Sequence, residues 1–202
     1  MPPHPDRPIA GLVLAAGGSR RLGRPKQLLP YRGRTLLDTV LDTARSCDFD
    51  QLLVALGGAA AEVRAEVDLT GCEVVENPAY GSGCWSSIAA ALPALRPDTG
   101  VLVLLLGDQP GVRAASGRAL LDGRGGAQLA LCRYADGRGH PIAFRRTAIP
   151  ELARLRGDKA VWRLLDARAE DVVEVPVAGV VPLDVDTEDD YRRVLADGRE
   201  TA

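Results

Sequence analysis

The chain has 202 residues, of which 46% are apolar and 26% are charged, and its formal net charge is −2. This length fits one large domain, and the composition is that of an ordinary globular protein. The balanced charge gives no sign of a nucleic-acid-binding surface, and no apolar run approaches the roughly 20 residues that a membrane span needs. The four cysteines are widely separated and there are only two histidines, which excludes the spacing of a zinc site. These features are typical of a cytosolic protein with free thiols.

Short apolar strands alternate with amphipathic helices along the first 125 residues or so. The pattern predicts strands at Ile9–Leu14, Gln51–Leu56, Cys72–Glu76 and Val101–Leu106, and helices at Thr35–Arg45, Ala59–Val67, Cys84–Leu95 and Ala114–Leu121. Near-continuous apolar strands are typical of a parallel sheet that is covered on both faces. We therefore expect an α/β fold, a three-layer α/β/α sandwich with a Rossmann-like, mostly parallel sheet.

The pattern changes after residue 126. The expected elements are strands at Gln128–Tyr134 and Pro141–Phe144 around a polar turn, two helical stretches, a strand at Val172–Val177 and a helix at Glu188–Leu195 capped by Thr187. The two strands around the turn predict a small antiparallel excursion from the parallel sheet. We expect a single domain over residues 9–202, preceded by a disordered leader over residues 1–8. The segment 127–186 is expected to decide between substrates.

A glycine-rich basic loop, Ala15–Lys26, follows the first strand. Its residues suited to an oxyanion are Gly17, Gly18 and Gly23, the hydroxyl of Ser19, and the basic side chains Arg20, Arg21, Arg24 and Lys26. Lys26 is one of only two lysines among 25 basic residues, and a compact ammonium suits a phosphate oxygen. Open α/β sheets bind ligands at the carboxyl ends of their strands, so this loop predicts a polyphosphate site.

Two familiar nucleotide-binding loops fit this segment poorly. Gly18 and Gly23 have the spacing of a P-loop, but arginine and proline follow in place of lysine and serine or threonine. A dinucleotide fingerprint runs straight into a helix, which Pro25 and Pro30 would interrupt. The structural alternative is a glycine-rich turn with solvated arginines.

Two acidic segments are candidates for a metal site. Asp108 follows the most apolar strand, so it opens onto the same crevice as the glycine loop. Near the C-terminus, Asp184 and Asp186 alternate, so both side chains could face one side of an extended segment. The residues Glu188–Asp190 are expected to be the acidic first turn of a helix. The alternatives are a turn aspartate for Asp108 and a cap residue for Asp186, and for Asp184 a structural role is favoured.

The loop Leu14–Lys26 resembles the nucleotide-binding loop of the molybdenum-cofactor and sugar-nucleotide nucleotidyltransferases. Its continuation Pro25–Pro30 is most similar to the molybdenum-cofactor cytidylyltransferase branch. The resemblance implies that Arg20 and Lys26 hold phosphates, with Lys26 near the α-phosphate. It also implies Mg²⁺, because Asp108 and Asp186 match the metal-binding motifs of the family. The catalytic residues implied are thus Arg20, Lys26 and Asp108, and the metal ligands are Asp108 and Asp186.

The segment Gly81–Ile88 opens a helix with small polar residues, which alone would predict an N-terminal cap. The resemblance places it beside the base and phosphates of the nucleotide, with Cys84 where methionine is usual. The nucleotide-binding residues implied are Leu14, Ala15, Ala16, Gly17, Gly18, Ser19, Gly23, Ser86 and Ser87.

On the acceptor side, the segment Arg138–Pro141 resembles an Arg-Gly-His-Pro motif of the family. Gly157–Lys159 matches the start of another, Gly-Asp-x-Gly-Ala-Arg, which is then broken at Ala160–Trp162. The arginine of that motif is missing unless Arg163 substitutes for it. The acceptor-binding residues implied are Arg138, His140 and Asp158. A structural role is the alternative for a lone histidine such as His140.

The function implied is a Mg²⁺-dependent cytidylyltransferase. A terminal phosphate on the acceptor attacks the α-phosphorus of CTP, and pyrophosphate leaves. The resemblance implies molybdopterin as the acceptor and a molybdenum enzyme as a partner. One alternative is a GTP- or CTP-dependent nucleotidyltransferase acting on a sugar phosphate, polyol phosphate or other small organic phosphate. A non-catalytic nucleotide- or cofactor-binding chaperone of a molybdenum enzyme is an alternative of a different class, and a dehydrogenase is a third.

Overall fold

The computed structural model describes residues 8–157 and 159–200. In chain order the strands are β1 (Ile9–Ala15), β2 (Pro30–Tyr31), β3 (Arg34–Thr35), β4 (Gln51–Leu56), β5 (Glu73–Glu76), β6 (Val101–Leu106), β7 (Leu129–Arg133), β8 (Arg138–Arg145) and β9 (Val172–Pro176). The α-helices are α1 (Leu36–Arg45), α2 (Ala60–Glu66), α3 (Cys84–Ala91), α4 (Ala114–Gly123), α5 (Ile149–Leu152), α6 (Ala160–Ala167) and α7 (Glu188–Glu200). The leader predicted over residues 1–8 lies outside the described residues except for Pro8, whose carbonyl accepts a hydrogen bond from the Gly100 amide.

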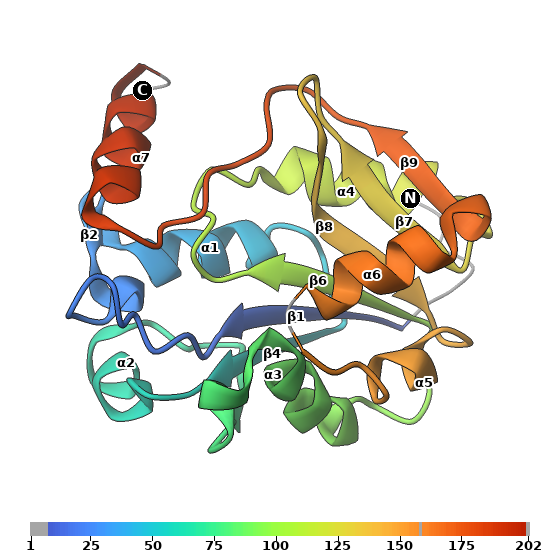
Figure 1. Cartoon of the computed structure of the whole chain (residues 1–202), viewed down its shortest axis with the longest axis horizontal. Coiled ribbons are helices and arrows are strands. Elements are labelled where there is room, and N and C mark those ends of the chain that lie inside the picture. The colour runs from blue at the N-terminus through green and yellow to red at the C-terminus, as the bar shows by residue number, and fades with distance from the viewer. Residues whose placement is uncertain (1–7, 158, 201–202) are drawn as a thin grey trace.

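The main sheet has seven strands in the order β5-β4-β1-β6-β8-β7-β9 (Figure 1). Strands β5, β4, β1, β6, β7 and β9 share one direction, and within the described residues β8 alone runs against them. The mostly parallel sheet and its antiparallel excursion are therefore confirmed. Because β8 is reversed, its amino end reaches the same edge of the sheet as the carboxyl end of β6.

Both faces of the sheet are buried under helices, which confirms the three-layer sandwich (Figure 1). Alternate residues of the central strand β6 point to opposite faces, as the pleat requires. Val103 packs in a core with residues of α1, α2, α4 and α7, whereas Leu104 packs in a second core with α3, α5 and α6. Both side chains are fully buried. The helices cover the faces of the sheet, whereas a cavity opens at the carboxyl ends of β1 and β6.

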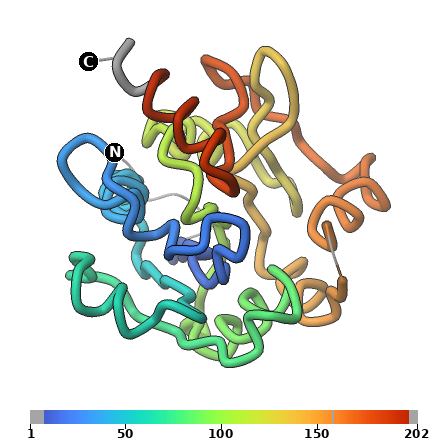
Figure 2. Tube along the Cα trace, turned by 60° about the vertical axis from the view of Figure 1, so that its left-hand side comes forward, coloured from blue at the N-terminus to red at the C-terminus, as the bar shows by residue number. Residues whose placement is uncertain are grey.

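Segments that are distant in the sequence meet at the carboxyl ends of β1 and β6. Leu14 of β1 is in register with Leu106 of β6, so the glycine loop and the turn after β6 leave the sheet side by side. The start of α7 lies beside the glycine loop (Figure 2), where Arg24 pairs with Glu188. Thr187 and Asp190 cap α7 reciprocally, which confirms the predicted cap.

Two predicted boundaries were wrong, for local reasons. The helix predicted over Cys84–Leu95 ends at Ala91, and a 3-10 turn follows because Pro93 has no amide hydrogen to donate. The polar turn predicted to contain Arg138 and His140 is shorter than expected, since β8 begins at Arg138. A bulge after Leu131 shifts the register so that β7 and β8 continue to pair. His140 is therefore a strand residue.

No helix within residues 8–157 and 159–200 combines the length and apolar character needed to cross a membrane.

Gly107 allows β6 to approach β1 closely where both strands end. A Cβ atom on Gly107 would lie 2.8 Å from the Cβ of Ala15 and 3.0 Å from the carbonyl oxygen of Leu14. We expect Gly107→Ala to lower the free energy of unfolding by about 1–3 kcal/mol, measured by equilibrium urea denaturation. The matched control is Gly126→Ala, since Gly126 is exposed and its nearest such neighbour is 4.0 Å away. Equal destabilisation by the two substitutions would contradict the close approach.

Candidate active site

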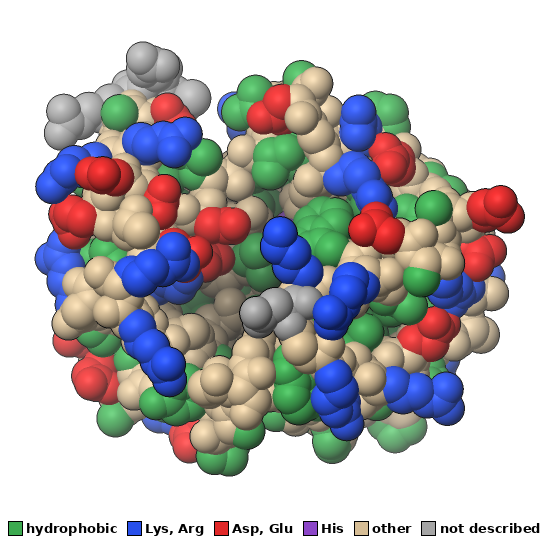
Figure 3. Space-filling view, in the orientation of Figure 1, with side chains coloured by type: hydrophobic (Ala, Val, Ile, Leu, Met, Phe, Trp, Pro, Cys, Tyr) green, Lys and Arg blue, Asp and Glu red, His purple; other side chains and the backbone are tan. Residues whose placement is uncertain are grey.

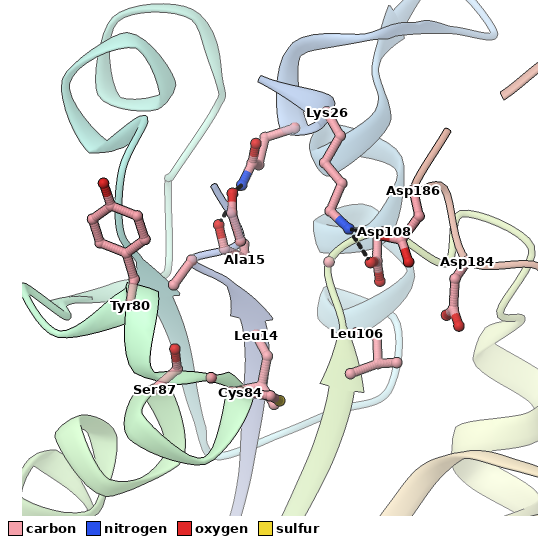
Figure 4. Close-up of a pocket in the computed structure, with 15 residues that line it drawn as sticks. Leu14, Ala15, Lys26, Tyr80, Cys84, Ser87, Leu106, Asp108, Asp184 and Asp186 are labelled. Atoms are coloured by element: carbon pink, nitrogen blue, oxygen red, sulfur yellow. Dashed lines mark hydrogen bonds and ion pairs between the residues drawn. The ribbon is translucent and has the colours of Figure 1, made fainter. Parts of the chain in front are cut away.

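A cavity of about 360 Å³ opens at the carboxyl ends of β1 and β6. It lies among four segments that the sequence singled out: the glycine loop, the turn after β6, the start of α3 and the segment before α7 (Figure 4). The surface is hollowed there, and basic side chains stand along the rim (Figure 3). The lining residues are Leu14, Ala15, Ala16, Gly17, Lys26, Gln27, Tyr80, Gly83, Cys84, Ser87, Leu106, Gly107, Asp108, Asp184 and Asp186.

Lys26 joins two of the predicted metal ligands within this cavity. Its Nζ lies 2.5 Å from Oδ2 of Asp108 and 2.8 Å from Oδ1 of Asp186 (Figure 4). The Lys26 side chain is only 12% exposed. Burial alone would lower the pKa of Lys26, but the charges and hydrogen bonds of the two carboxylates outweigh it and raise that pKa. The ammonium is therefore charged at neutral pH.

The segment before α7 is held against the turn after β6. The Val185 amide donates to the Asp108 carbonyl at 3.0 Å, so the side chains of Asp184 and Asp186 both reach the cavity (Figure 4). Asp184, for which a structural role is favoured from the sequence, also lines the cavity, because alternation along the extended segment brings its carboxylate to the same side as that of Asp186. Although Asp184 is exposed to the cavity, burial and then the charge of Asp108 raise its pKa to about 6.

Asp186 carries a second cation. Nη2 of Arg21 lies 2.7 Å from its Oδ2, while Lys26 holds its Oδ1. Burial would raise the pKa of Asp186, but hydrogen bonds and charge from Lys26 and Arg21 lower it. Arg21 was recognised in the sequence only as one basic residue of the loop, and its pairing with a residue 165 positions later has no sequence signal.

The glycine loop is closed by its own polar groups. Oγ of Ser19 accepts a hydrogen bond from the Lys26 amide at 2.9 Å, and its carbonyl accepts from the amides of Leu22 and Gly23. Ser19 and Gly23 both have positive φ, of 48° and 67°. Gly23 allows the conformation that the loop needs, as its glycine predicted. The hydroxyl of Ser19 is therefore committed to the shape of the loop.

Gln27 fixes the base of the loop and was missed as a site residue. Its Nε2 donates to the carbonyls of Ala15, at 2.6 Å, and Gly17, at 3.1 Å, and the side chain is buried. Tyr80 was also missed; it stands against Gly18 from the opposite side of the cavity. Neither residue has a pattern in the sequence that distinguishes it from an ordinary polar or aromatic residue.

The two serines of α3 have different positions. Ser87 lines the cavity, whereas Ser86 donates to the carbonyl of Gly83 at 2.7 Å and is turned toward the η2 (Tyr80–Ser82) segment. Nδ2 of Asn77 donates to both hydroxyls, at 2.8 and 3.0 Å. Ser87 therefore faces the cavity, whereas Ser86 stabilises the start of the helix. Arg20 does not line the cavity, and its Nη2 lies beside Gly81.

The predicted acceptor residues Arg138 and His140 do not line this cavity. The His140 ring is buried in β8 and meets Trp162 edge-on, with centroids 5.7 Å apart. The guanidinium of Arg138 lies over Trp162 and pairs with Asp166 and Glu174, at 2.8 and 3.2 Å. Asp158 lies outside the described residues.

Nη2 of Arg163 donates a hydrogen bond to the carbonyl of Arg156. At the position where the family motif has an arginine, this chain has the aromatic side chain of Trp162.

The carboxylates suit a divalent ion held jointly with a substrate. Among the described residues no group of three or more histidine, cysteine, aspartate and glutamate side chains is arranged to hold a metal. Mg²⁺ commonly binds through one or two carboxylates, completed by waters and substrate phosphates. Asp108 and Asp186 already share one cation, so their oxygens are close enough to share another. The residues present fit such an ion.

Residues 11–172 match the MobA-like NTP transferase domain. The chain belongs to this family. The resemblance drawn from the glycine loop and the acidic motifs is confirmed at this level, as is the enzyme class, a nucleotidyltransferase.

The structure is similar to that of Rv0371c from Mycobacterium tuberculosis H37Rv, with 51% identity and a TM-score of 0.89 over 95% of this chain and 99% of that one. A complex of Rv0371c with manganese is also similar, at 49% identity and a TM-score of 0.83, over 94% and 99% of the chains. Molybdopterin-guanine dinucleotide biosynthesis protein A from Archaeoglobus fulgidus, at 20% identity and a TM-score of 0.65 over 95% and 99%, shares the fold.

A relative with a different name is the nicotine blue oxidoreductase of Paenarthrobacter nicotinovorans. It is 35% identical over 154 residues, which are 72% of this chain and 74% of that protein.

Burial of His140 predicts a pH dependence of stability. Burial lowers the pKa of His140 from 6.5 to about 4. Between pH 4 and pH 6.5 the histidine of the unfolded chain binds a proton, whereas His140 of the folded protein stays neutral. The free energy of unfolding is therefore unaffected by His140 above pH 6.5 and decreases as the pH falls toward 4. The loss should reach about 3 kcal/mol.

We expect urea denaturation between pH 4 and 7 to show this slope in the wild type and its reduction in His140→Phe. The matched control is His4→Gln, which removes the other histidine of the chain and should retain the slope. Identical slopes in His140→Phe and the wild type would show that His140 does not titrate as described.

Proposed function

We propose that this protein transfers CMP from CTP to a phosphorylated acceptor, with molybdopterin as that acceptor, and releases pyrophosphate. The observation that carries the proposal is the meeting of Lys26, Asp108 and Asp186 in one cavity beside the glycine loop. The choice of CTP and of molybdopterin is supported by the similarity of Pro25–Pro30 to the cytidylyltransferase branch. A manganese complex of a 49% identical protein supports a divalent ion, for which we propose Mg²⁺.

The chain supplies positioning and charge neutralisation. An oxygen of the acceptor phosphate attacks the α-phosphorus in line, and the bond from that phosphorus to the bridging oxygen of pyrophosphate breaks. Backbone amides around Gly17 and Gly18 hold the phosphates, Arg20 adds charge from the rim, and Lys26 reaches the α-phosphate. A divalent ion, when bound at Asp108 and Asp186, would neutralise charge that develops on the phosphates.

No covalent intermediate is needed for this reaction. The thiol nearest the reacting groups is Cys84, which lines the cavity. Burial and then the charge of Asp108 raise the pKa of Cys84 to about 11, so the thiol is protonated at neutral pH. A protonated thiol is a poor nucleophile, which leaves direct transfer as the favoured chemistry.

We propose that the acceptor contacts the protein beside β8 through van der Waals packing on Trp162 rather than through charged side chains. The charge of Arg138 is compensated by Asp166 and Glu174, and His140 is neutral at pH 7 because burial lowers its pKa to about 4. Both side chains instead support the ring of Trp162, which stands where the family motif has arginine. Asp158 stays a predicted acceptor ligand.

The test is pyrophosphate release with CTP, GTP and ATP against a panel of phosphorylated acceptors in the presence of Mg²⁺. We expect release with CTP and molybdopterin, and a loss on the order of 10²–10³-fold in rate for Asp108→Asn. The matched control is Asp98→Asn, an exposed aspartate before the opposite end of β6, which should keep the wild-type rate. A wild-type rate in Asp108→Asn would remove Asp108 from the mechanism.

The acceptor and nucleotide panels also decide between the alternatives. Release with a sugar or polyol phosphate but not with molybdopterin would favour the broader nucleotidyltransferase. Nucleotide binding without release from any pair would favour a cofactor-binding chaperone.

The 35% identity with a nicotine blue oxidoreductase favours oxidation or reduction of a substrate as a second candidate. The dehydrogenase alternative from the sequence would then imply a nicotinamide cofactor. The two activities require different ligands in the cavity, since only transfer of a nucleotide requires a nucleoside triphosphate with Lys26 at its α-phosphate. We expect no change in the fluorescence of NADH or NADPH when the protein is added. A rise in melting temperature with CTP, measured in a thermal-shift assay, is the positive control for a protein that is competent to bind nucleotide. Saturable binding of NADH or NADPH that persists in excess CTP and in excess GTP would support the oxidoreductase instead.

A further inference from the structure

The cation that Asp108 and Asp186 hold is part of the chain itself. Lys26 contacts one oxygen of each carboxylate, at 2.5 and 2.8 Å, and Arg21 contacts the remaining oxygen of Asp186 at 2.7 Å. Carboxylate oxygens of this kind are ligands of divalent ions. An ion that binds both carboxylates through these oxygens must therefore displace the Lys26 ammonium.

Displacement of Lys26 is unfavourable unless a new anion receives it. The side chain is 12% exposed, so an ammonium that left the two carboxylates would remain largely buried without an opposite charge. Lys26 also lies against the backbone of the glycine loop, with its Cε 3.4 Å from a Cβ position on Gly17. A nucleotide phosphate bound by that loop would be within reach of the ammonium.

Asp184 adds a third negative charge to the cavity. Asp184 lines the same cavity, so three carboxylates face the two cations Lys26 and Arg21 there. Transfer of Lys26 to a phosphate leaves the carboxylates with an excess of negative charge. That excess favours a divalent ion, whereas the free protein has little such excess at Asp108 and Asp186.

We propose that Lys26 is the resident cation of the metal site in the free protein, and that its transfer to the nucleotide phosphates opens Asp108 and Asp186 to the divalent ion. Nucleotide and ion then bind with positive coupling, which resides in Lys26. The coupling is reciprocal, because each ligand favours the state in which Lys26 has moved. This inference rests on the proposed nucleotide site and adds to Lys26 a positioning role distinct from its contact with the α-phosphate.

The test measures binding rather than turnover. Mn²⁺ affinity is determined by electron paramagnetic resonance without nucleotide, and CTP affinity by calorimetry in EDTA. We expect Lys26→Gln to bind Mn²⁺ about ten-fold more tightly than the wild type and metal-free CTP about ten-fold more weakly. A merely structural role of Lys26 would weaken both. Lys26→Arg, which keeps a cation at this position, should retain the weak Mn²⁺ binding of the wild type.

Controls separate the local effect from net charge and from folding. Arg96→Gln removes one positive charge, as Lys26→Gln does. Arg96 pairs with Glu73 and donates to the carbonyl of Asp50, just before β4, at the end of the strands opposite the site. This variant should leave the Mn²⁺ affinity unchanged. Circular dichroism verifies the fold of each variant, and Lys26→Met replaces Lys26→Gln if the latter unfolds. In the double variant with Asp108→Asn the gain in Mn²⁺ affinity should disappear.

Two results would overturn the inference: equal or weaker Mn²⁺ binding by folded Lys26→Gln and Lys26→Met, or a gain that persists in the double variant. Failure of the proposed function is distinguishable from either. A protein that never releases pyrophosphate but shows the Mn²⁺ gain loses the function and keeps the resident cation. A protein that releases pyrophosphate while Lys26→Gln shows no gain keeps the function and loses the resident cation.

Discussion

The architecture of the site depends on one ammonium between two carboxylates. Lys26 comes from the first loop of the chain, Asp108 from the turn after the central strand and Asp186 from the segment before the last helix. Their contacts span 82 and 160 residues. Each neighbouring feature serves this meeting point: Ser19 shapes the loop that carries Lys26, and the Val185 amide fixes its segment on Asp108. A partly buried charge cluster of this kind demands precise placement, because each member is costly when left unpaired.

The fold itself follows from simple rules acting at the strand ends. Parallel strands bring their carboxyl ends to one edge, and right-handed crossovers leave the loops there uncovered. Loops that follow β1 and β6 are therefore neighbours, although the paired residues Leu14 and Leu106 at the ends of these strands lie 92 positions apart in the sequence. The helices of both outer layers bury the faces of the sheet and leave this edge for chemistry. The polar residues of the site line a cavity at this edge that packing does not fill.

Much of this could be predicted from the sequence, because local patterns govern it. Apolar strand runs gave the layers, and Gly23 and the glycine–aspartate turn at Asp108 gave the site its position. What escaped prediction depends on tertiary contacts: the pairing of Arg21 with Asp186, the hold of Gln27 on the loop carbonyls, and the exposure of Asp184 to the cavity. His140 was placed in a turn because glycine and polar residues precede it, whereas strand pairing across a bulge extended β8 to include it.

Because strand β8 is reversed, the β7–β8 turn can tolerate insertions and deletions more readily than the loops that follow β1 and β6. The nucleotide half is built from loops that leave parallel strands, and each of those loops must also feed a crossover helix that covers the sheet. The β7–β8 connection at residues 134–137 is instead a hairpin turn, which carries no helix and sits at the same edge. Insertions or deletions there would reshape the surface beside β8, where we propose that the acceptor binds, without moving the loops that carry Lys26 and Asp108. A lineage on this scaffold can thus acquire a new acceptor while its nucleotide chemistry is inherited unchanged.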